Sequence, residues 1–328
     1  MKNVLITGVS GFVGRHFCRY FLENKFHVTG VDNLVKFTGA IDPNKGWPLF
    51  NPYDFKYFKF INADCVEWFK KNKKKKFDYV LHLAAIVGGR EVIENNPLAV
   101  ASDLTIDSNF WQWCLTAKPK KILYFSSSAS YPLNLQKKNY YRLLRENDIS
   151  FKNNLGVPDY TYGWSKLTGE YLAQICYEKY GLKSVCYRPF SGYGEDQDMN
   201  YPFPNLCKNI ILSKKKRKVE VWGNGKQMRD FIHIDDCVMG VIKTMDKIDN
   251  GEAINLSTGK YTSFIEFLKI SRNIIGNDFK IVTKKSKPVG VFARGGCTKK
   301  QRKLGFKYQV DLKLGIDKGI NYLSKIIN

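Results

Sequence analysis

A tyrosine and a lysine at helical spacing are the residues of this 328-residue sequence that point most directly to chemistry. Tyr162 and Lys166 lie in the segment DYTYGWSKLTGEYLA, whose composition favours a helix. Positions four apart on a helix share one face, so the phenol and the ammonium are expected in one site. A neighbouring cation favours the phenolate, and we expect it to lower the pKa of the tyrosine from ~10 towards neutrality, as a general base requires.

Three consecutive serines supply hydroxyls that such a base needs beside it. Ser126, Ser127 and Ser128 follow residues 121–125, an apolar run that is expected to form a strand. One of these hydroxyls can hold a substrate oxygen beside the phenol. A tyrosine–lysine pair alone arises often by chance, and the serines strengthen the catalytic interpretation.

The N-terminal residues predict a nucleotide-binding turn. Gly8, Gly11 and Gly14 in VLITGVSGFVG separate a strand-like segment from a helical one. Glycine is needed where a pyrophosphate touches the backbone, and the following helix points its free N–H groups at the phosphates. Asp32 ends the next strand-like segment, where a carboxylate accepts hydrogen bonds from the adenosine ribose hydroxyls and repels a 2′-phosphate. The pattern predicts NAD rather than NADP.

For other polar residues, the sequence predicts either a weakly supported ligand contact or a structural role. Asp64, after residues 57–63, is placed to meet the adenine amino group, with an ordinary strand end as the alternative. His82 and His233 lie in apolar runs and are interpreted as structural histidines rather than bases. No group of His, Cys, Asp and Glu has metal-ligand spacing, so no metal is predicted.

The elements that must position these residues predict an α/β fold. Apolar runs alternate with helical patterns in the first half of the chain, which is typical of a doubly wound parallel sheet of the Rossmann type. The sequence favours two domains: a nucleotide-binding domain of residues 1–190 plus about 231–250, and a smaller C-terminal α/β substrate-binding domain of residues 191–230 and 251–328. The expected strands are residues 3–9, 27–33, 57–64, 79–85, 121–128 and 184–190, with the first helix at residues 12–24. A short strand and a helix are expected within residues 230–245, and residues 37–57 are expected to be a loop over the cofactor side.

Composition narrows the class of protein. The chain is 44% hydrophobic, so it can bury a core, and its eight cysteines are scattered singly rather than in a disulfide or zinc pattern. No apolar run approaches the ~20 residues that a membrane span requires, and the N-terminus has no signal-peptide layout. We therefore expect a cytoplasmic protein with no membrane partner. The net charge of +23 is concentrated partly in residues 70–76 and 214–218, which are interpreted as solvated lysine runs rather than a nucleic-acid groove.

The order of these motifs resembles the extended short-chain dehydrogenase/reductase family, which comprises NAD-dependent nucleotide-sugar epimerases, dehydratases and relatives. The resemblance rests on VLITGVSGFVG, Asp32, HLAA, FSSSAS, YGWSK, YRPFSGYG and RDFIHIDD, and it covers nearly the whole chain. It implies that Tyr162 is the base, that Lys166 is its partner and that Ser128 is the third catalytic residue. Ser127 remains an alternative, because Tyr131-Pro132 comes one residue early relative to the family's usual turn.

The resemblance also implies which residues bind the ligands. The cofactor residues are Gly8, Gly11, Phe12, Val13, Gly14, Asp32, Asn33, Asp64, Cys65, Leu83, Ala84, Ala85, Ser126, Tyr162 and Lys166. The substrate residues are Val87, Gly88, Arg90, Ser128, Ser191, Arg229 and Arg294. The two later arginines are expected to hold the pyrophosphate of a nucleotide-diphosphate sugar through bidentate contacts. The VGGR stretch at residues 87–90 is similar to a loop of GDP-sugar epimerases and favours a GDP-sugar.

The resemblance further narrows the reaction. Dehydratases of the family carry an Asp-Glu pair after the strand-end hydroxyl residue, where this chain has Ala129-Ser130. Chemistry confined to carbon 4 is therefore expected, as a 4-epimerase or a 4-dehydrogenase, and the sequence does not separate the two. The chain is similar to capsule-polysaccharide enzymes that oxidise GDP-heptose. Other nucleotide-sugar chemistry (a 3,5-epimerase/reductase or a 4,6-dehydratase), a non-catalytic NAD-binding regulator and a basic nucleic-acid-binding protein are the alternatives. A homodimer is expected, with residues 102–117 and the helix after Tyr162 at its interface through Phe110, Trp113 and Leu167.

Overall fold

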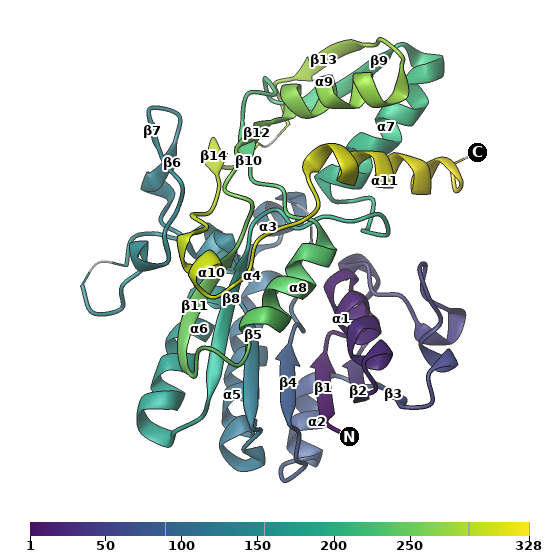
Figure 1. Cartoon of the computed structure of the whole chain (residues 1–328). Coiled ribbons are helices and arrows are strands. Elements are labelled where there is room, and N and C mark those ends of the chain that lie inside the picture. The colour runs from purple at the N-terminus through teal and green to yellow at the C-terminus, as the bar shows by residue number, and fades with distance from the viewer. Residues whose placement is uncertain (89, 154, 288, 328) are drawn as a thin grey trace.

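A large parallel sheet organises the chain. The structure is a computed structural model that describes residues 1–88, 90–153, 155–287 and 289–327. Within these residues the sheet has seven strands in the order β11-β8-β5-β4-β1-β2-β3. Their bounds are β1 Asn3–Thr7, β2 His27–Asp32, β3 Phe58–Asn62, β4 Tyr79–His82, β5 Lys121–Phe125, β8 Ser184–Pro189 and β11 Asn250–Leu256. Every neighbouring pair is parallel, so all carboxyl ends lie at one edge, which faces the upper lobe in Figure 1.

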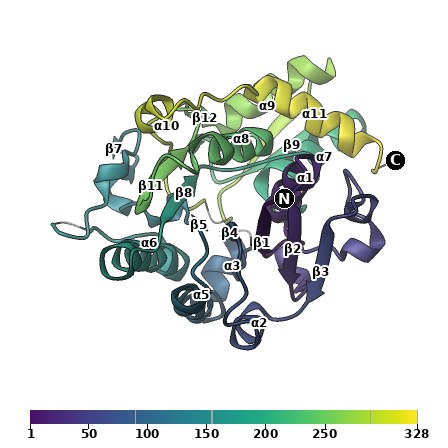
Figure 2. The ribbon, with the colours of Figure 1, turned by 60° about the horizontal axis from the view of Figure 1, so that its bottom comes forward.

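Helices cover both faces of this sheet (Figure 2). On one face lie α1 Phe12–Glu23 and α8 Ile234–Thr244, and on the other lie α2 Cys65–Lys71, α5 Asp103–Ala117 and α6 Tyr160–Tyr180. Successive strand residues supply the two cores in turn, because side chains alternate along a strand. In β1, Val4 and Ile6 pack with the α1 side while Leu5 packs with the α2 and α5 side.

A second lobe lies above the carboxyl edge of the sheet (Figure 1). Its core joins aromatic and aliphatic side chains of three helices and a small parallel pair of strands. The bounds are α7 Pro202–Lys216, α9 Phe264–Ile275, α11 Leu312–Ser324, β9 Lys218–Trp222 and β13 Lys280–Lys284. A three-stranded sheet, β12-β10-β14, is formed by β10 Met228–Arg229, β12 Thr262–Ser263 and β14 Ala293–Arg294.

Short elements complete the described chain. The helices α3 Arg90–Asn95 and α4 Pro97–Ala101 precede α5, and α10 Lys299–Lys303 follows β14. A hairpin of β6 Gln136–Lys137 and β7 Tyr140–Tyr141 projects between β5 and α6. Single 3₁₀ turns are η1 Lys36–Thr38, η2 Pro43–Lys45, η3 Pro52–Asp54, η4 Ser128–Ser130, η5 Leu133–Leu135 and η6 Glu146–Asp148.

The fold agrees with the sequence prediction in class and differs in two details. The six expected strands and the first helix are confirmed, and residues 37–57 form loops with 3₁₀ turns and one isolated bridge between Trp47 and Phe50. However, β11 pairs with β8 in the large sheet, although the sequence analysis assigned residues from 251 onward to the second domain. Residues 230–245 give helix α8 as expected, but the expected strand is reduced to one bridge between Tyr193 and His233. The remaining domain division stays a prediction.

Candidate active site

Helix α6 presents Tyr162 and Lys166 beside each other. The Lys166 ammonium lies 5.9 Å from the centre of the Tyr162 ring and 5.5 Å from that of Tyr124, which belongs to β5. Lys166 is 3% exposed, whereas Tyr162 is partly exposed. Asp159 precedes the helix, and the Gly163 N–H donates to its carbonyl, so the turn that carries Tyr162 is fixed from its first residue.

Of the two serines left open by the sequence, Ser127 is the one that affects the ionisation of the phenol. The Ser127 side chain acts to lower the pKa of Tyr162, and its hydroxyl accepts a hydrogen bond from the Ala129 N–H at 3.1 Å. Ser128 begins the 3₁₀ turn η4 and is only 5% exposed. The geometry therefore favours Ser127 as the hydroxyl beside Tyr162, although the sequence analysis chose Ser128.

The direction of the pKa shift of Tyr162 corrects one expectation. The sequence analysis expected Lys166 to lower the pKa of the phenol towards neutrality. In the ligand-free protein the burial of Tyr162 raises its pKa above the ordinary value, although Lys166 and Ser127 both act to lower it. A spacing of four residues places the cation correctly, but it carries no information about how much water the fold removes from the phenol.

Two aspartates of α5 stand opposite Lys166 and were missed by the sequence analysis. Asp107 accepts a hydrogen bond from the Tyr124 hydroxyl at 2.5 Å and lies 3.1 Å from Nε2 of His82. Asp103, one turn earlier, accepts a hydrogen bond from the Ile86 N–H at 2.5 Å. Burial acts to lower the pKa of Lys166, but Asp107, Asp103 and Tyr162 together outweigh it and the pKa is raised. The spacing of four in SDLTIDSN was the available signal.

His82 has the structural role that the sequence predicted. Its Nδ1 lies 2.8 Å from the Thr7 hydroxyl, and its ring stacks on Phe110 with centroids 3.9 Å apart. His233 is 0% exposed and caps α8 by accepting a hydrogen bond from the Asp235 N–H. The described residues contain no group of three or more His, Cys, Asp and Glu side chains that could hold a metal ion.

The glycine turn after β1 is shaped for a close ligand. Gly8 has φ +72°, and a Cβ there would lie 2.8 Å from the Ala84 nitrogen. A Cβ on Gly14 would lie 2.2 Å from the Gly8 carbonyl oxygen, so helix α1 starts in direct contact with the turn. A Cβ on Gly11 would meet only that oxygen, at 3.4 Å. Gly8 and Gly14 are thus required by the fold itself, while Gly11 leaves space beside the backbone where a pyrophosphate of NAD fits.

Asp32 is held at the end of β2, and its carboxylate can accept further hydrogen bonds. Its Oδ2 accepts a hydrogen bond from the Ser10 N–H and its Oδ1 accepts one from the Leu34 N–H, both at 2.9 Å. Burial raises the pKa of Asp32, while these two bonds act to lower it. A carboxylate has about four acceptor sites, so the two ribose hydroxyls of NAD can still be received. Asn33 follows it and is exposed.

The other predicted cofactor residues surround the carboxyl edge of the large sheet. Two of them already form hydrogen bonds within the protein. Asp64 caps helix α2 through the N–H groups of Val66 and Glu67, so its Oδ1 serves the fold. The Ser126 hydroxyl donates to Glu170 and lies 3.0 Å from Ser130. The remaining residues occupy the first turns of α1 and α2 and the loop after β4, and they are Phe12, Val13, Cys65, Leu83, Ala84 and Ala85.

The two predicted pyrophosphate arginines are cross-strand neighbours. Arg229 of β10 pairs in register with Arg294 of β14 in a parallel ladder, which brings their side chains to one face. Arg294 donates to Gln136 at 2.7 Å and to Asp159 at 2.8 Å, which ties it to the start of the Tyr162 helix. Arg229 donates to the carbonyl oxygens of Met228, Val289 and Val291. Gln136 and Asp159 were not anticipated from the sequence.

The remaining predicted substrate residues lie on loops at the same edge. Val87 and Gly88 follow β4, while the Arg90 side chain lies outside the described part of the structure. Ser191 follows β8 with a φ of +33°, a conformation that non-glycine residues rarely adopt. Such strain persists where the surrounding structure enforces it, and it is frequent at ligand sites.

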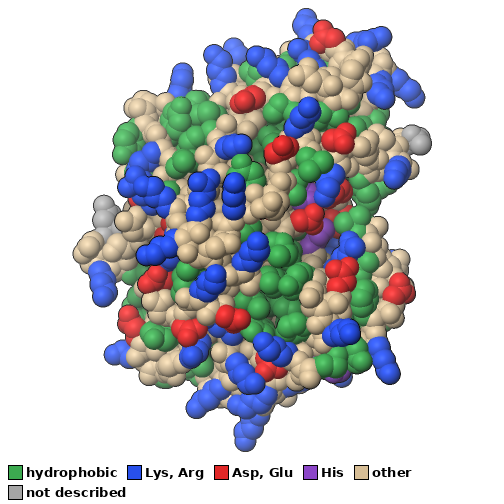
Figure 3. All heavy atoms as spheres, viewed as in Figure 1, with side chains coloured by type: hydrophobic (Ala, Val, Ile, Leu, Met, Phe, Trp, Pro, Cys, Tyr) green, Lys and Arg blue, Asp and Glu red, His purple; other side chains and the backbone are tan. Residues whose placement is uncertain are grey.

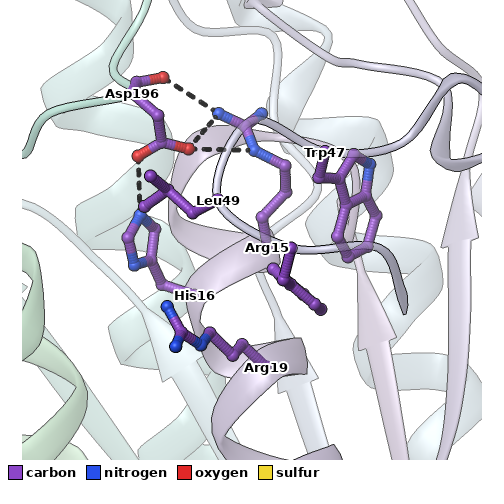
Figure 4. A pocket seen from close by; sticks show the side chains of 7 residues that line it. Arg15, His16, Arg19, Trp47, Leu49 and Asp196 are labelled. Atoms are coloured by element: carbon purple, nitrogen blue, oxygen red, sulfur yellow. Dashed lines mark hydrogen bonds and ion pairs between the residues drawn. The ribbon is translucent and has the colours of Figure 1, made fainter. Parts of the chain in front are cut away.

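A small hollow beside α1 is separate from this site (Figure 4). It is lined by Arg15, His16, Arg19, Trp47, Leu49, Phe50 and Asp196. Arg15 and His16 both point to Asp196, at 2.9 Å and 2.8 Å. Asp196 therefore holds both Arg15 and His16, and Arg15 links the glycine turn to the loop of residues 37–57 by donating to the carbonyl oxygens of Ser10 and Gly39.

No described helix is long and apolar enough to span a bilayer. All eight cysteines are free thiols, and seven of them are buried.

Comparisons with known proteins agree with this geometry. The chain is 27% identical to the uncharacterized UDP-glucose epimerase YtcB of Bacillus subtilis, over 99% of this chain and 98% of that protein. The UDP-glucose 4-epimerase of Thermotoga maritima with UDP-glucose superposes with a TM-score of 0.83 at 23% identity, covering 99% of this chain and 100% of that chain. The UDP-glucuronic acid 4-epimerase of Bacillus cereus with UDP-glucuronic acid and NAD gives a TM-score of 0.80 at 24% identity, covering 99% of each chain.

These structural likenesses establish the fold. The model of the "NAD dependent epimerase/dehydratase family" matches residues 4–257, which is more than half of the sequence. The glycine turn, Asp32 and the Tyr162–Lys166 pair lie within that match. The protein is therefore a member of the NAD-dependent epimerase/dehydratase family, and its cofactor is NAD.

Proposed function

We propose that the protein oxidises the 4-hydroxyl of a nucleotide-diphosphate sugar, with Tyr162 as the base. The observation that carries this proposal is the buried Lys166 ammonium 5.9 Å from the centre of the Tyr162 ring, with Ser127 acting on the same phenol. A non-catalytic NAD-binding protein would need the glycine turn but not this arrangement. The product is either the 4-epimer, after return of the hydride to the other face, or a released 4-keto sugar.

The proton chemistry follows from the two hydroxyl-bearing side chains. Ser127 orients the sugar hydroxyl, and the phenolate of Tyr162 takes its proton as the carbon–hydrogen bond breaks. When bound, NAD accepts the hydride that leaves carbon 4. Lys166 keeps the phenolate stable throughout, because its pKa is raised and it remains an ammonium. Turnover should consequently rise with pH as Tyr162 ionises.

The turn after β5 favours chemistry confined to carbon 4. Residues 129 and 130 are alanine and serine, and the Ser130 hydroxyl is engaged with Ser126 at 3.0 Å. A dehydratase needs an acid and a base at this position to remove the proton on carbon 5 and to protonate the leaving hydroxyl. Neither side chain can supply that pair.

The diphosphate is assigned to the arginine pair of β10 and β14. Guanidinium groups bind phosphate oxygens through two parallel hydrogen bonds, and Arg229 and Arg294 are in register for a group that spans both. The nucleotide base has two candidates. The loop at residues 87–90 favours a GDP-sugar by resemblance, whereas the named relatives act on UDP-sugars.

The test is product analysis with matched UDP- and GDP-sugars, including GDP-heptose, in deuterated water. A 4-epimerase gives an isomer of unchanged mass with no net NADH, and a 4-dehydrogenase gives a keto sugar with one NADH per turnover. Tyr162→Phe is the control and should give neither product. Loss of water from the sugar, or deuterium at carbon 5, would contradict the assignment to carbon 4.

A further inference from the structure

Asp103 is a buried carboxyl with an unused oxygen. It is the first residue of α5 and is 0% exposed. Its Oδ1 accepts the hydrogen bond from Ile86, but its Oδ2 has no hydrogen-bond partner among the described residues. A buried acceptor without a donor destabilises the folded protein. Packing at the start of α5 does not require a carboxyl at position 103. A role in the active site is therefore the better explanation for the buried carboxyl of Asp103.

Lys166 is the cation that acts on this carboxyl. Helix α5 packs against α6, and Asp103 and Lys166 act on each other electrostatically. Among the described residues, the Lys166 ammonium has no ion pair or hydrogen bond, and it lies over the Tyr162 and Tyr124 rings. Asp107 is committed to Tyr124 and His82. Asp103 is thus the carboxyl near Lys166 whose second oxygen remains open.

Two acids compete for this one positive charge. Burial raises the pKa of Asp103 to about 7, with Lys166 acting to lower it and Asp107 acting to raise it. Burial also raises the pKa of Tyr162, again opposed by Lys166, and here Asp103 adds to the rise. As the pH increases, Asp103 ionises first and offsets part of the effect of Lys166. The phenol then ionises at higher pH than it would beside Lys166 alone.

We propose that Asp103 is a positioning residue that shares the charge of Lys166 with Tyr162 and thereby sets how readily the phenol ionises. The consequence for turnover rests on the proposed role of Tyr162 as the base, but the charge sharing itself does not. Asp103 does not touch the reacting atoms. It acts only through its electrostatic interaction with Lys166.

Among the residues that the structure describes, the charged groups that act on Asp103 are Lys166 and Asp107. The ionisable groups in this part of the site are Lys166 and Tyr162 from α6, Asp107 from α5, His82 from β4 and Tyr124 from β5. Helix α4 has no ionisable side chain, and Glu94 belongs to the described part of α3. Tyr201 adjoins Tyr162 from the other lobe.

The first test measures the ionisation of Tyr162 in the ligand-free protein. Tyrosinate absorbance is recorded against pH, and the curve of the matching Tyr162→Phe protein is subtracted to isolate this phenol. Asp103→Asn keeps an oxygen for the Ile86 N–H and removes the charge, so we expect the Tyr162 midpoint to fall by about 1 pH unit or more. Glu178→Gln is the matched control: it removes one negative charge from an exposed position of α6 and should leave the midpoint unchanged.

The second test does not depend on the folding of Asp103→Asn. The carboxyl carbons of aspartate are labelled, and the Asp103 resonance is assigned by its loss in Asp103→Glu. It should titrate near neutral pH in the wild type and at higher pH in Lys166→Met, because the cation that stabilises the carboxylate is gone. An Asp103 resonance that titrates in the ordinary aspartate range, or a Tyr162 midpoint unmoved in folded Asp103→Asn, would overturn the proposal.

Kinetics separate this inference from the proposed function. If both hold, the pH–rate profile of Asp103→Asn moves to lower pH by the same amount as the Tyr162 titration. If the Tyr162 titration moves but the pH–rate profile does not, Asp103 controls the ionisation of the phenol, but Tyr162 is not the base.

Discussion

Tyr162 occupies a position in which two physical effects oppose each other. The fold removes water from the phenol, which raises its pKa, and Lys166 and Ser127 act in the other direction. The pair was identifiable from sequence because helical spacing fixes which side chains share a face. The net direction of the pKa shift of Tyr162 could not be predicted from the sequence. It depends on burial and on Asp103 and Asp107, which belong to a different helix.

Replacement of Tyr162 by phenylalanine isolates the proton transfer. Tyr162→Phe removes one oxygen, so binding of NAD and sugar nucleotide should persist while turnover falls by roughly 10²–10⁴, the usual contribution of a positioned base. Equilibrium binding and single-turnover kinetics with the identified substrate provide the measurement. Near-normal turnover would show that another group takes the proton.

The two serines give a matched comparison. Ser127→Ala should lower turnover by about 10- to 100-fold, the worth of one hydrogen bond to a charged group, because Ser127 acts to lower the pKa of the phenol. Ser128→Ala is the control from the same turn and should have a smaller effect, since Ser128 is buried within η4. Turnover numbers of the two variants decide the matter, and the reverse ranking would restore Ser128 as the third catalytic residue.

At the scale of elements, the turn between β1 and α1 separates structural glycines from one that faces a ligand. Gly14→Ala would place a Cβ 2.2 Å from the Gly8 carbonyl oxygen, so it should lower the thermal stability. Gly11→Ala meets that oxygen only at 3.4 Å and should fold normally. Its methyl group would nevertheless stand where the pyrophosphate approaches, so NAD affinity should fall by about tenfold or more. Thermal unfolding and NAD titration test both variants; unchanged NAD affinity in Gly11→Ala would place the phosphates elsewhere.

The ladder of β10 and β14 tests the diphosphate site. Arg294→Lys keeps a cation for Asp159 but loses the planar fork that matches a phosphate, so KM for the sugar nucleotide should rise about tenfold while NAD affinity is unchanged. Arg302→Lys, on the exposed side of α10, is the control. An unchanged KM in Arg294→Lys would remove this arginine from the substrate site.

Elements with strong local patterns were predictable, and those defined by distant partners were not. The buried parallel strands follow from their apolar runs. Strand β11 was assigned to the wrong lobe because nothing in residues 250–256 reveals that they pair with β8, more than sixty residues away. Arg229 and Arg294 were named from motifs, but their cross-strand register and the contacts of Arg294 with Gln136 and Asp159 exist only in the folded chain.

At the scale of the whole molecule, the net charge of +23 extends beyond the two lysine runs at residues 70–76 and 214–218. Figure 3 shows Lys and Arg side chains over both lobes on this face, with acidic side chains among them. A field of this kind raises the encounter rate with anionic sugar nucleotides and weakens with salt.

The surface of α5 and α6 differs from what the dimer prediction assumed. Phe110, Trp113 and Leu167 are 0%, 4% and 1% exposed, so they belong to the core of the chain and not to an interface. Other apolar side chains of the same two helices do face outward: Leu104, Trp164 and Tyr171 are 41%, 44% and 45% exposed. Trp164 and Tyr171 are seven residues apart and therefore share one helix face.

A homodimer through this face remains our prediction, now carried by Leu104, Trp164 and Tyr171. Trp164→Lys combined with Tyr171→Glu should yield a monomer in sedimentation velocity at micromolar concentration, because both substitutions place charge in an apolar contact. Tyr140→Glu, at an equally exposed tyrosine of the β6–β7 hairpin, is the control and should leave the dimer intact. A wild-type monomer would contradict the prediction directly, and a dimer that survives the double substitution would place the interface on another surface.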